Sequence, residues 1–212
     1  MRKAFFLASL FLQVIALAGT ITVHNTGVNS SDVLVAPGAQ ASFWTLSAEP
    51  AGAVEAIGSN PFRFNCCYFP DTATAAWVSP QANGNAGAGG FYTYDLVINL
   101  TGLDPTTASI SGIFGTDNDG SIFLNSNAAA ATTCFACFGA PTTFTINSGF
   151  VAGLNTIHVK VDNGGDPTAF FVSFTSAIAG GGSAVPEPAT ILLTCAGLVG
   201  LLALRRPIAP RR

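Results

Sequence analysis

An alternation of apolar and polar side chains in the second half of the chain constrains the fold most strongly. Every second residue from Tyr92 to Leu100 is apolar, and the polar residues Thr93, Asp95 and Asn99 stand between them. The same period recurs at Phe144 and Ile146, from Ile157 to Val161, and from Phe170 to Phe174. A period of two is typical of half-buried strands. Because turn residues separate these segments and no amphipathic helix interrupts them, we expect an all-β body, a jelly roll or β-sandwich.

The first half offers weaker strand candidates at residues 21–24, 33–35 and 43–47. Further on, the sequence 117–120, Asp-Asn-Asp-Gly, predicts a tight hairpin turn between strands at 108–115 and 121–124. Residues 81–90 are almost all Gly, Asn and Ala, which indicates a flexible surface loop.

The N-terminus has the pattern of a secretory signal. Arg2 and Lys3 precede an apolar stretch at residues 4–17, and small residues then lead to a predicted cleavage site after Ala18. We therefore expect an N-terminal signal helix at 1–18 and export through the inner membrane. A retained N-terminal membrane anchor is the alternative.

The C-terminus carries a second apolar segment. Residues 189–204 hold no charge and would form a helix of about 24 Å, somewhat short for a hydrocarbon core of about 30 Å. The motif Val185, Pro186, Glu187, Pro188 precedes this run, and Arg205 and Arg206 follow it. Paired arginines favour the cytoplasmic side. We expect a single transmembrane helix here.

These features divide the chain into five segments. They are a signal peptide at 1–18, a β-sandwich domain at 19–178, a Gly-rich linker at 179–184, an apolar tail with its transmembrane helix at 185–206, and a basic tail at 207–212.

The charges separate these segments sharply. Six of the eight basic residues lie in the two terminal signals, so residues 20–184 keep only Arg63 and Lys160 against ten carboxylates, a net charge of about −8. Such a body repels nucleic acid and anionic membrane surfaces, which makes nucleic-acid binding an excluded class.

Four cysteines lie in the body: Cys66, Cys67, Cys134 and Cys137. In an oxidising compartment we expect two disulfides, and three connectivities are open. Pairing of the first two with the last two would tie the irregular first half to the sandwich. The alternative, a four-thiolate metal site, fits poorly because Cys66 and Cys67 are adjacent.

The sequence offers no established catalytic motif. His24 and His158 are predicted on outward strand positions, and no nucleophile elbow, phosphate loop or zinc-protease motif is present. We therefore expect no enzyme activity, no resident metal and no cofactor. Calcium at residues 117–120 is the alternative, although the twelfth position of an EF-hand loop is Ala128.

A ligand surface can still be suggested. Tryptophan faces beside polar groups can stack on sugar rings, although core packing is the competing interpretation of each tryptophan. The candidate residues are Trp44, Trp77, Asp117, Asn118, Asp119 and Asn163.

Two resemblances add to this interpretation. The run Val185-Pro-Glu-Pro-Ala-Thr190, the apolar segment to Leu204 and the arginine pair resemble the PEP-CTERM sorting signal of Gram-negative, exopolysaccharide-producing bacteria. The resemblance implies processing by an exosortase, a membrane protease, after transient anchoring in the inner membrane. It also implies display at the cell surface or in the extracellular matrix.

The body resembles a galactose-binding-like jelly roll, through stretches that include 77–80, 92–100, 116–120, 153–157 and 162–168. This resemblance implies a fold that is often used for carbohydrate binding. We expect an exported, non-catalytic protein that binds carbohydrate such as exopolysaccharide in a biofilm matrix. A secreted carbohydrate-active hydrolase and a purely structural matrix protein are the alternatives.

Overall fold

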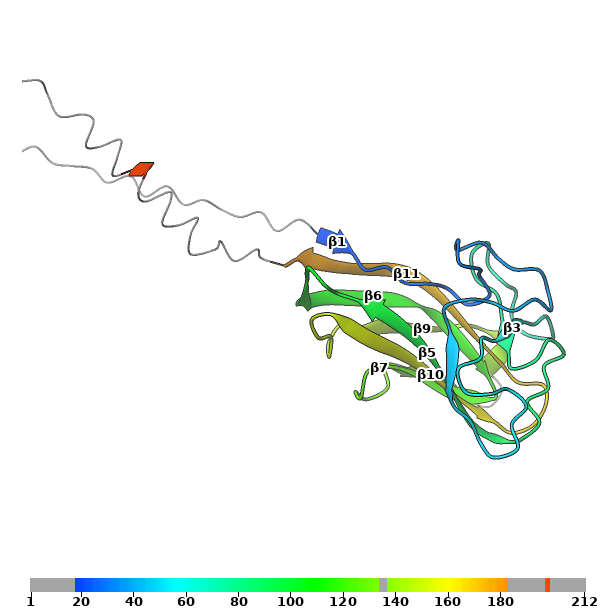
Figure 1. Cartoon of the computed structure of the whole chain (residues 1–212). Helices are drawn as coiled ribbons and strands as arrows, with labels where there is room; N and C mark the ends of the chain where they lie inside the picture. Colours follow the sequence, from blue (N-terminus) through cyan, green and yellow to red (C-terminus); the bar gives the residue numbers. More distant parts are fainter. Residues whose placement is uncertain (1–17, 134–136, 183–196, 199–212) are drawn as a thin grey trace, which may run out of the picture. The chain divides into compact units, whose positions relative to one another are not determined.

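A computed structural model describes residues 18–133, 137–182 and 197–198. The chain divides into two compact units, Met1–Gly181 and Gly182–Arg212. The first unit contains the described β-sandwich (Figure 1). Of the second unit, only Gly182, Gly197 and Leu198 are described, and the last two are helical.

Two antiparallel sheets form the body (Figure 1). The six-stranded sheet has the order β3 (Phe62–Arg63), β4 (Val78–Ser79), β11 (Ala169–Gly181), β6 (Leu103–Asp117) and β9 (Thr142–Ile146), and β1 (Ala18–Thr20) also pairs with β11. The five-stranded sheet has the order β2 (Thr45–Ala48), β5 (Gly90–Asn99), β10 (Leu154–Asn163), β7 (Asp119–Leu124) and β8 (Ala131–Thr132). A single 3-10 turn, η1 (Cys137–Gly139), is the only helical element within 18–182 as described. The prediction of an all-β sandwich is confirmed at this level.

The main core lies between the two sheets. It contains the inward-facing residues of β5 and β10 from one sheet. The other sheet contributes Ile110, Phe114, Phe170 and Val172. Tyr94 of β5 stacks on Phe170 of β11 with ring centroids 4.4 Å apart. The alternation seen in the sequence from Tyr92 to Leu100 therefore becomes the inner face of the five-stranded sheet, as expected.

The connection after β6 differs from the expectation. β6 pairs with β11 and β9, whereas β7 pairs with β10 and β8, so the chain crosses from one sheet to the other at Asn118. The prediction of a hairpin at 117–120 is wrong. A local turn motif cannot distinguish a chain that returns beside the preceding strand from one that crosses the sandwich, because partner choice is set by the core.

The sheets also extend beyond the expected domain limits. Ala18, placed in the signal peptide, pairs with Gly180, and β11 runs on through Gly181 into the segment expected as a linker. Residues 33–35, expected as a strand, form only an isolated bridge between Val28 and Leu34. Residues 81–90 are irregular, but they are held in place, since Thr168 N–H donates to Gly84 O and the Tyr92 hydroxyl to Ala86 O.

A second aromatic cluster lies on the outer face of the six-stranded sheet. Phe171 and Ala169 of β11 point away from the main core and pack against Phe64, Phe69 and Trp77. At Gly115 of β6 a methyl group would lie 2.6 Å from Phe69 Cε1, so only glycine lets the aromatic ring approach the strand this closely. We call the part of this sheet beneath residues 64–77 the covered face.

The predicted terminal helices fall mostly outside the described residues. The signal peptide at 1–17, the motif at 185–188 and the arginines at 205–206 are not described. Within the part of the chain that is described, no helix is long and apolar enough to cross a membrane.

Candidate functional site

The two tryptophans proposed for ligand stacking are buried. Trp44 is 1% exposed and Trp77 is 2% exposed. The Trp44 indole donates to the carbonyl of His24 at 3.0 Å, and the Trp77 indole donates to that of Phe69 at 2.9 Å. An indole enclosed in this way has no free face for a sugar ring. The stacking interpretation of Trp44 and Trp77 is therefore wrong, and both are core residues.

The other four candidates do come together, at the place where the chain crosses between the sheets. The Tyr68 hydroxyl donates to Asp117 Oδ2 at 2.8 Å, and the Gly164 N–H donates to Asn118 Oδ1 at 2.5 Å. Asn163 is 2% exposed and donates to the carbonyl of Ala88 at 3.0 Å. Asp117 and Asn118 thus hold the crossing to Tyr68 and Gly164, whereas Asn163 bonds to the loop before β5.

Asp117 and Asp119 differ in their surroundings. Burial raises the pKa of the Asp117 carboxyl, and the hydrogen bond from Tyr68 partly lowers it again. Asp119 Oδ1 is buried and accepts no hydrogen bond from the described residues. In the described ranges no group of three or more His, Cys, Asp and Glu side chains is placed to hold a metal ion. The calcium alternative at 117–120 stays a prediction.

The outer face of the five-stranded sheet carries a different and more accessible set of side chains. We call it the open face and define it by the outward residues of β5, β10 and β7. The register aligns them in rows across the strands: Asp95, His158 and Phe123; Thr93, Lys160 and Ser121; Phe91, Asp162 and Asp119. Each row combines groups from three strands, so the sheet itself holds them in position.

A groove of about 270 Å³ lies at the second and third of these rows, the rows of Lys160 and Asp162. Its lining residues are Phe91, Asp119, Gly120, Ser121, Thr132, Thr133, Lys160 and Asp162. The Lys160 ammonium sits 3.7 Å from the centre of the Phe91 ring, and the Phe91 side chain is about half exposed. Lys160 forms no ion pair with the described carboxylates. The groove thus offers an aromatic surface, hydroxyl groups, carboxylates and one cation.

The upper row holds a histidine in a fixed orientation. His158 Nδ1 lies 2.6 Å from Asp95 Oδ1, and its ring stacks on Phe123 with centroids 4.8 Å apart. His24 is held in the same manner, 2.7 Å from Asp32 Oδ1 and stacked on Phe43. The His24 and His158 side chains are only 18% and 20% exposed. His158 lies in β10 as predicted, but residues 21–24 form no strand, so His24 lies in an irregular segment. Each has an aspartate partner that sequence spacing did not predict. Among the described residues no hydroxyl or thiol bonds to Nε2 of either ring, as an acyl-transfer triad would need.

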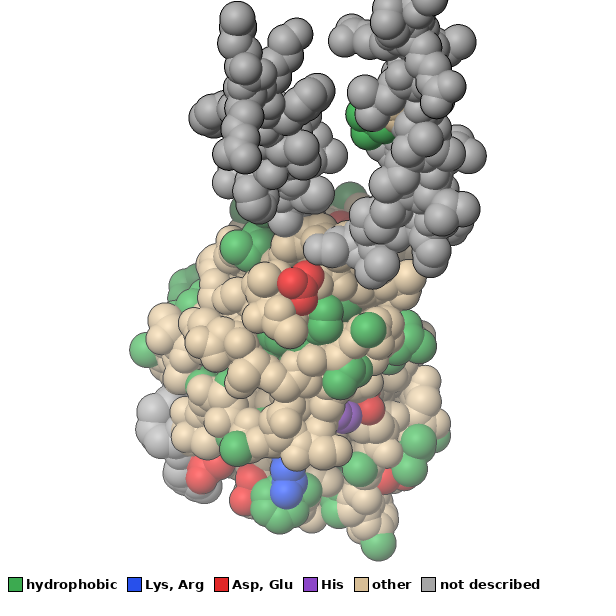
Figure 2. All heavy atoms as spheres, turned by 90° about the vertical axis from the view of Figure 1, so that its left-hand side faces the viewer, with side chains coloured by type: hydrophobic (Ala, Val, Ile, Leu, Met, Phe, Trp, Pro, Cys, Tyr) green, Lys and Arg blue, Asp and Glu red, His purple; other side chains and the backbone are tan. Residues whose placement is uncertain are grey.

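Figure 2 shows one side of the body, on which charged side chains are few and scattered among polar and hydrophobic atoms. Ion pairing is correspondingly sparse, and Arg63 with Asp71 at 2.9 Å is the only described pair that involves a permanent cation. Recognition by a dense charge pattern is therefore not available to this surface.

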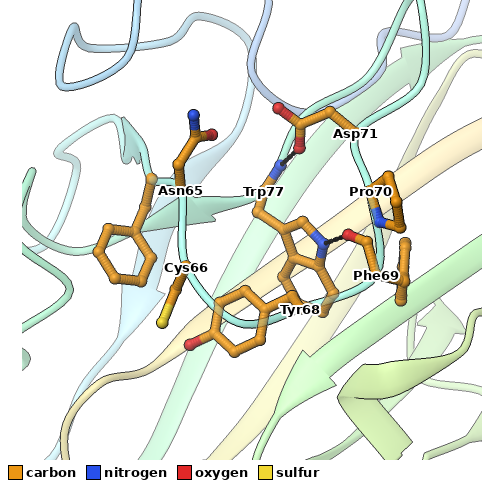
Figure 3. A pocket seen from close by; sticks show the side chains of 8 residues that line it. Asn65, Cys66, Tyr68, Phe69, Pro70, Asp71 and Trp77 are labelled. Atoms are coloured by element: carbon orange, nitrogen blue, oxygen red, sulfur yellow. Dashed lines mark hydrogen bonds between the residues drawn. The ribbon is translucent and has the colours of Figure 1, made fainter.

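A second pocket of about 230 Å³ lies within the loop over the covered face (Figure 3). Cys66 and Tyr68 line it together with the edge of Trp77. Asp71 accepts a hydrogen bond from Trp77 N–H at 3.0 Å and pairs with Arg63, so its carboxylate is already occupied. The polar groups of this pocket hold the loop, and few remain free for a ligand.

The disulfide prediction stays open. Cys66 and Cys67 are both exposed, with Sγ atoms 2.7 Å apart. Cys134 and the side chain of Cys137 lie outside the described part of the chain. The element that begins at Cys137 is nevertheless close to the first pair, because Phe69 N–H donates to Phe138 O at 2.9 Å and Phe138 packs edge-on against Tyr68. Cross-pairing is compatible with this proximity.

Sequence reasoning missed the open face as a site. The sequence feature that could have indicated this site is that the outward-facing residues of β10 are all polar. They are Thr156, His158, Lys160 and Asp162. Which residues of β5 and β7 lie beside these could not be read from the sequence, because register across strands depends on tertiary pairing.

Comparison with known proteins recognises only the tail. The model of a protein-sorting family, the PEP-CTERM protein-sorting motif, matches residues 184–206. No curated protein and no solved structure matches the chain. The tail thus places the chain in the class of exported proteins that are anchored in a membrane transiently. Within that class, the PEP-CTERM motif marks it for processing by an exosortase, a membrane protein, before display at the surface.

Proposed function

We propose that the processed body is a non-catalytic surface or matrix protein that binds extracellular polysaccharide through its open face. The observation that carries this proposal is the alignment of partly exposed aromatic rings with polar side chains on a rigid, uncovered sheet. Phe91 and Phe123 lie on the outer strands of the set, with Lys160 and His158 between them. Sugars present apolar ring faces and hydroxyl edges, which such a surface matches.

The shape of the groove agrees with a polymer ligand. Its volume of about 270 Å³ is just below the range of about 300–1,000 Å³ typical of small-molecule pockets. A shallow groove of this size suits one sugar unit at a time, with neighbouring units resting along the rows. Because the body carries a net charge of about −8, a neutral polysaccharide is preferred over a polyanion.

The sorting partner is an exosortase that cuts near Pro186-Glu187-Pro188. We place the precursor in the inner membrane of a Gram-negative bacterium and the processed body at the cell surface or in the biofilm matrix. Intact-mass measurement of surface-derived protein tests this directly. A mass that lacks the residues after the motif supports processing, and a mass that still contains residues 191–212 contradicts it.

Polysaccharide binding is tested by affinity electrophoresis in gels that contain polysaccharide extracted from the producing cells. We expect retardation of the wild-type protein, and at least about tenfold weaker binding for Phe91→Ala and Lys160→Ala. Thr143→Ala is the matched control, because Thr143 is an exposed strand residue of the other sheet. Equal retardation of all variants would place binding elsewhere, and no retardation of the wild type would favour a purely structural matrix role.

A hydrolase is the second candidate, because the register brings two carboxylates opposite one another in the groove. Asp119 and Asp162 are direct cross-strand partners, and paired carboxylates are what glycoside hydrolysis requires. Release of reducing ends from the same polysaccharide, abolished by Asp119→Asn and by Asp162→Asn, would establish this function in place of binding alone.

A further inference from the structure

Glu55 is buried without a cationic partner. Its side chain lies in the irregular segment after β2 and is 3% exposed. The Tyr94 hydroxyl donates to Glu55 Oε2 at 2.8 Å, but Glu55 Oε1 is buried and has no hydrogen-bond partner among the described residues. A buried carboxylate oxygen left in this way is costly unless a proton or a cation accompanies it.

Glu49 provides a second such oxygen nearby. Its Oε2 atom is also buried and without a partner in the described part of the chain. The chain folds back between the two glutamates, since Ala53 N–H donates to Pro50 O at 3.2 Å and Val54 N–H to Ala86 O at 3.0 Å. Glu49 directly follows Ala48, which pairs with Thr93 of β5, and Glu55 bonds to Tyr94 of the same strand, so both glutamates lie beside the same stretch of β5.

No described residue supplies a positive charge to this pair. Between residues 20 and 184 the only basic side chains are Arg63 and Lys160. Arg63 bonds to Asp71 and to the carbonyl of Val35, and Lys160 sits over Phe91. Tyr92, on the same inner face of β5 as Tyr94, directs its hydroxyl to the carbonyls of Ala86 at 3.1 Å and Ala88 at 2.8 Å.

We propose that Glu49 and Glu55 bind a divalent cation of the calcium type, through Glu49 Oε2 and Glu55 Oε1, with water filling the remaining positions. Calcium prefers carboxylate, carbonyl and water oxygens and tolerates irregular geometry. Tyr94 fixes the orientation of Glu55 by bonding to the oxygen that the ion does not use. With two acidic ligands, we expect the weak affinity of extracellular modules, a Kd of about 10⁻⁴–10⁻³ M.

The site would join two parts of the body. Glu49 and Glu55 belong to the segment between β2 and β3, whereas Tyr92 and Tyr94 belong to β5 at the centre of the fold. A bound ion would therefore pin this irregular segment to the edge of the five-stranded sheet. This site is separate from the groove on the open face and does not depend on polysaccharide binding.

The experiment uses the full chain in detergent, first treated with a chelator. Terbium replaces calcium at oxygen sites, and emission sensitised by Tyr94 and Tyr92 reports an ion beside these rings. We expect saturable sensitised emission that calcium displaces, and a melting temperature that rises with added calcium. Glu49→Gln and Glu55→Gln should each weaken terbium binding by about tenfold or more. Asp104→Asn, an exposed acid next to Thr106, is the matched control and should bind as the wild type does.

The possible results distinguish specific ion binding from no binding and from non-specific binding. Absence of sensitised emission and of a calcium-dependent melting shift in the wild type overturns the proposal. Equal loss of emission in Asp104→Asn would show non-specific binding by the acidic surface and would also overturn it. Each Gln variant must melt cooperatively in chelator, which shows that lost binding is not lost folding.

Discussion

The two outer faces of the sandwich differ in whether other residues cover them. The covered face is closed by residues 64–77, whose aromatic side chains build a second core on Phe171. Over the open face the described residues form no such layer, and its outward side chains remain partly exposed along three strands. Residues 64–77 close part of one sheet's outer face with aromatic packing, whereas the other sheet keeps aromatic and polar side chains partly exposed, so the difference favours the open face for recognition.

The largest expected effect is a difference in the free energy of unfolding between a substitution on the covered face and one on the open face. Phe171→Ala removes a fully buried ring from the covered face and should lower the free energy of unfolding by about 3–5 kcal/mol. Phe91→Ala on the open face removes a half-exposed ring and should cost less than about 1 kcal/mol. Urea denaturation of both variants measures the difference. Similar losses would mean that the open face is as tightly packed as the covered one.

A pH-dependent effect is expected beside the five-stranded sheet, where burial raises the pKa of Glu55 from 4.5 to about 8. The unfolded chain releases this proton from about pH 4.5 upward, whereas the folded chain holds it to about pH 8. Without metal, the contribution of Glu55 to stability should therefore be highest below pH 4.5, decline between pH 4.5 and 8, and then level off.

Glu55→Gln should remove this decline, because the amide stays neutral at every pH. Allowing for screening by nearby solvent, we expect the variant in chelator to be on the order of 2 kcal/mol more stable than the wild type at pH 8. Thermal unfolding at pH 5 and pH 8 measures it. An unchanged pH slope in the variant would show that Glu55 is not the titrating group.

A smaller effect tests the hydrogen bond that joins residues 64–77, the loop over the covered face, to Asp117. Tyr68→Phe removes the hydrogen bond to Asp117 and should cost about 1 kcal/mol, since one buried bond is lost while the ring packing is kept. The pKa of Asp117 should rise further, because this bond lowers it in the wild-type protein. Titration followed by NMR measures that pKa. A fall in the Asp117 pKa would contradict the assigned contact.

The smallest effect is expected at the centre of the open face. Lys160→Ala removes a cation held over Phe91 and no ion pair among the described residues, so the stability should change by less than about 1 kcal/mol. A larger loss would mean that Lys160 has a structural role and is not reserved for ligand contact.

The two faces also differ in how far the sequence predicts them. The strands β5 and β10 follow from their alternation, because one side of each packs into the main core. The covering loop has no such period. Phe64, Phe69 and Trp77 are spaced irregularly, and only the tertiary structure shows that they meet over Gly115. For the same reason Trp44 and Trp77 look like candidate ligand residues in the sequence and turn out to be core.

The sorting tail, unlike the loop over the covered face, can be predicted from the sequence alone. Its proline motif, apolar run and arginine pair are local in sequence, and the match to residues 184–206 confirms the PEP-CTERM motif. The partners of the open face are not local, so their alignment could not be derived from strand patterns alone. The galactose-binding-like likeness of the body stays a prediction.

The most direct test of the open face is hydroxyl-radical footprinting of the protein with and without its polysaccharide. We expect Phe91 and Phe123 to lose oxidation when the ligand is added, while Tyr68 over the covered face keeps its level. Protection of Tyr68 with no change at Phe91 and Phe123 would contradict the account and place recognition on the loop over the covered face.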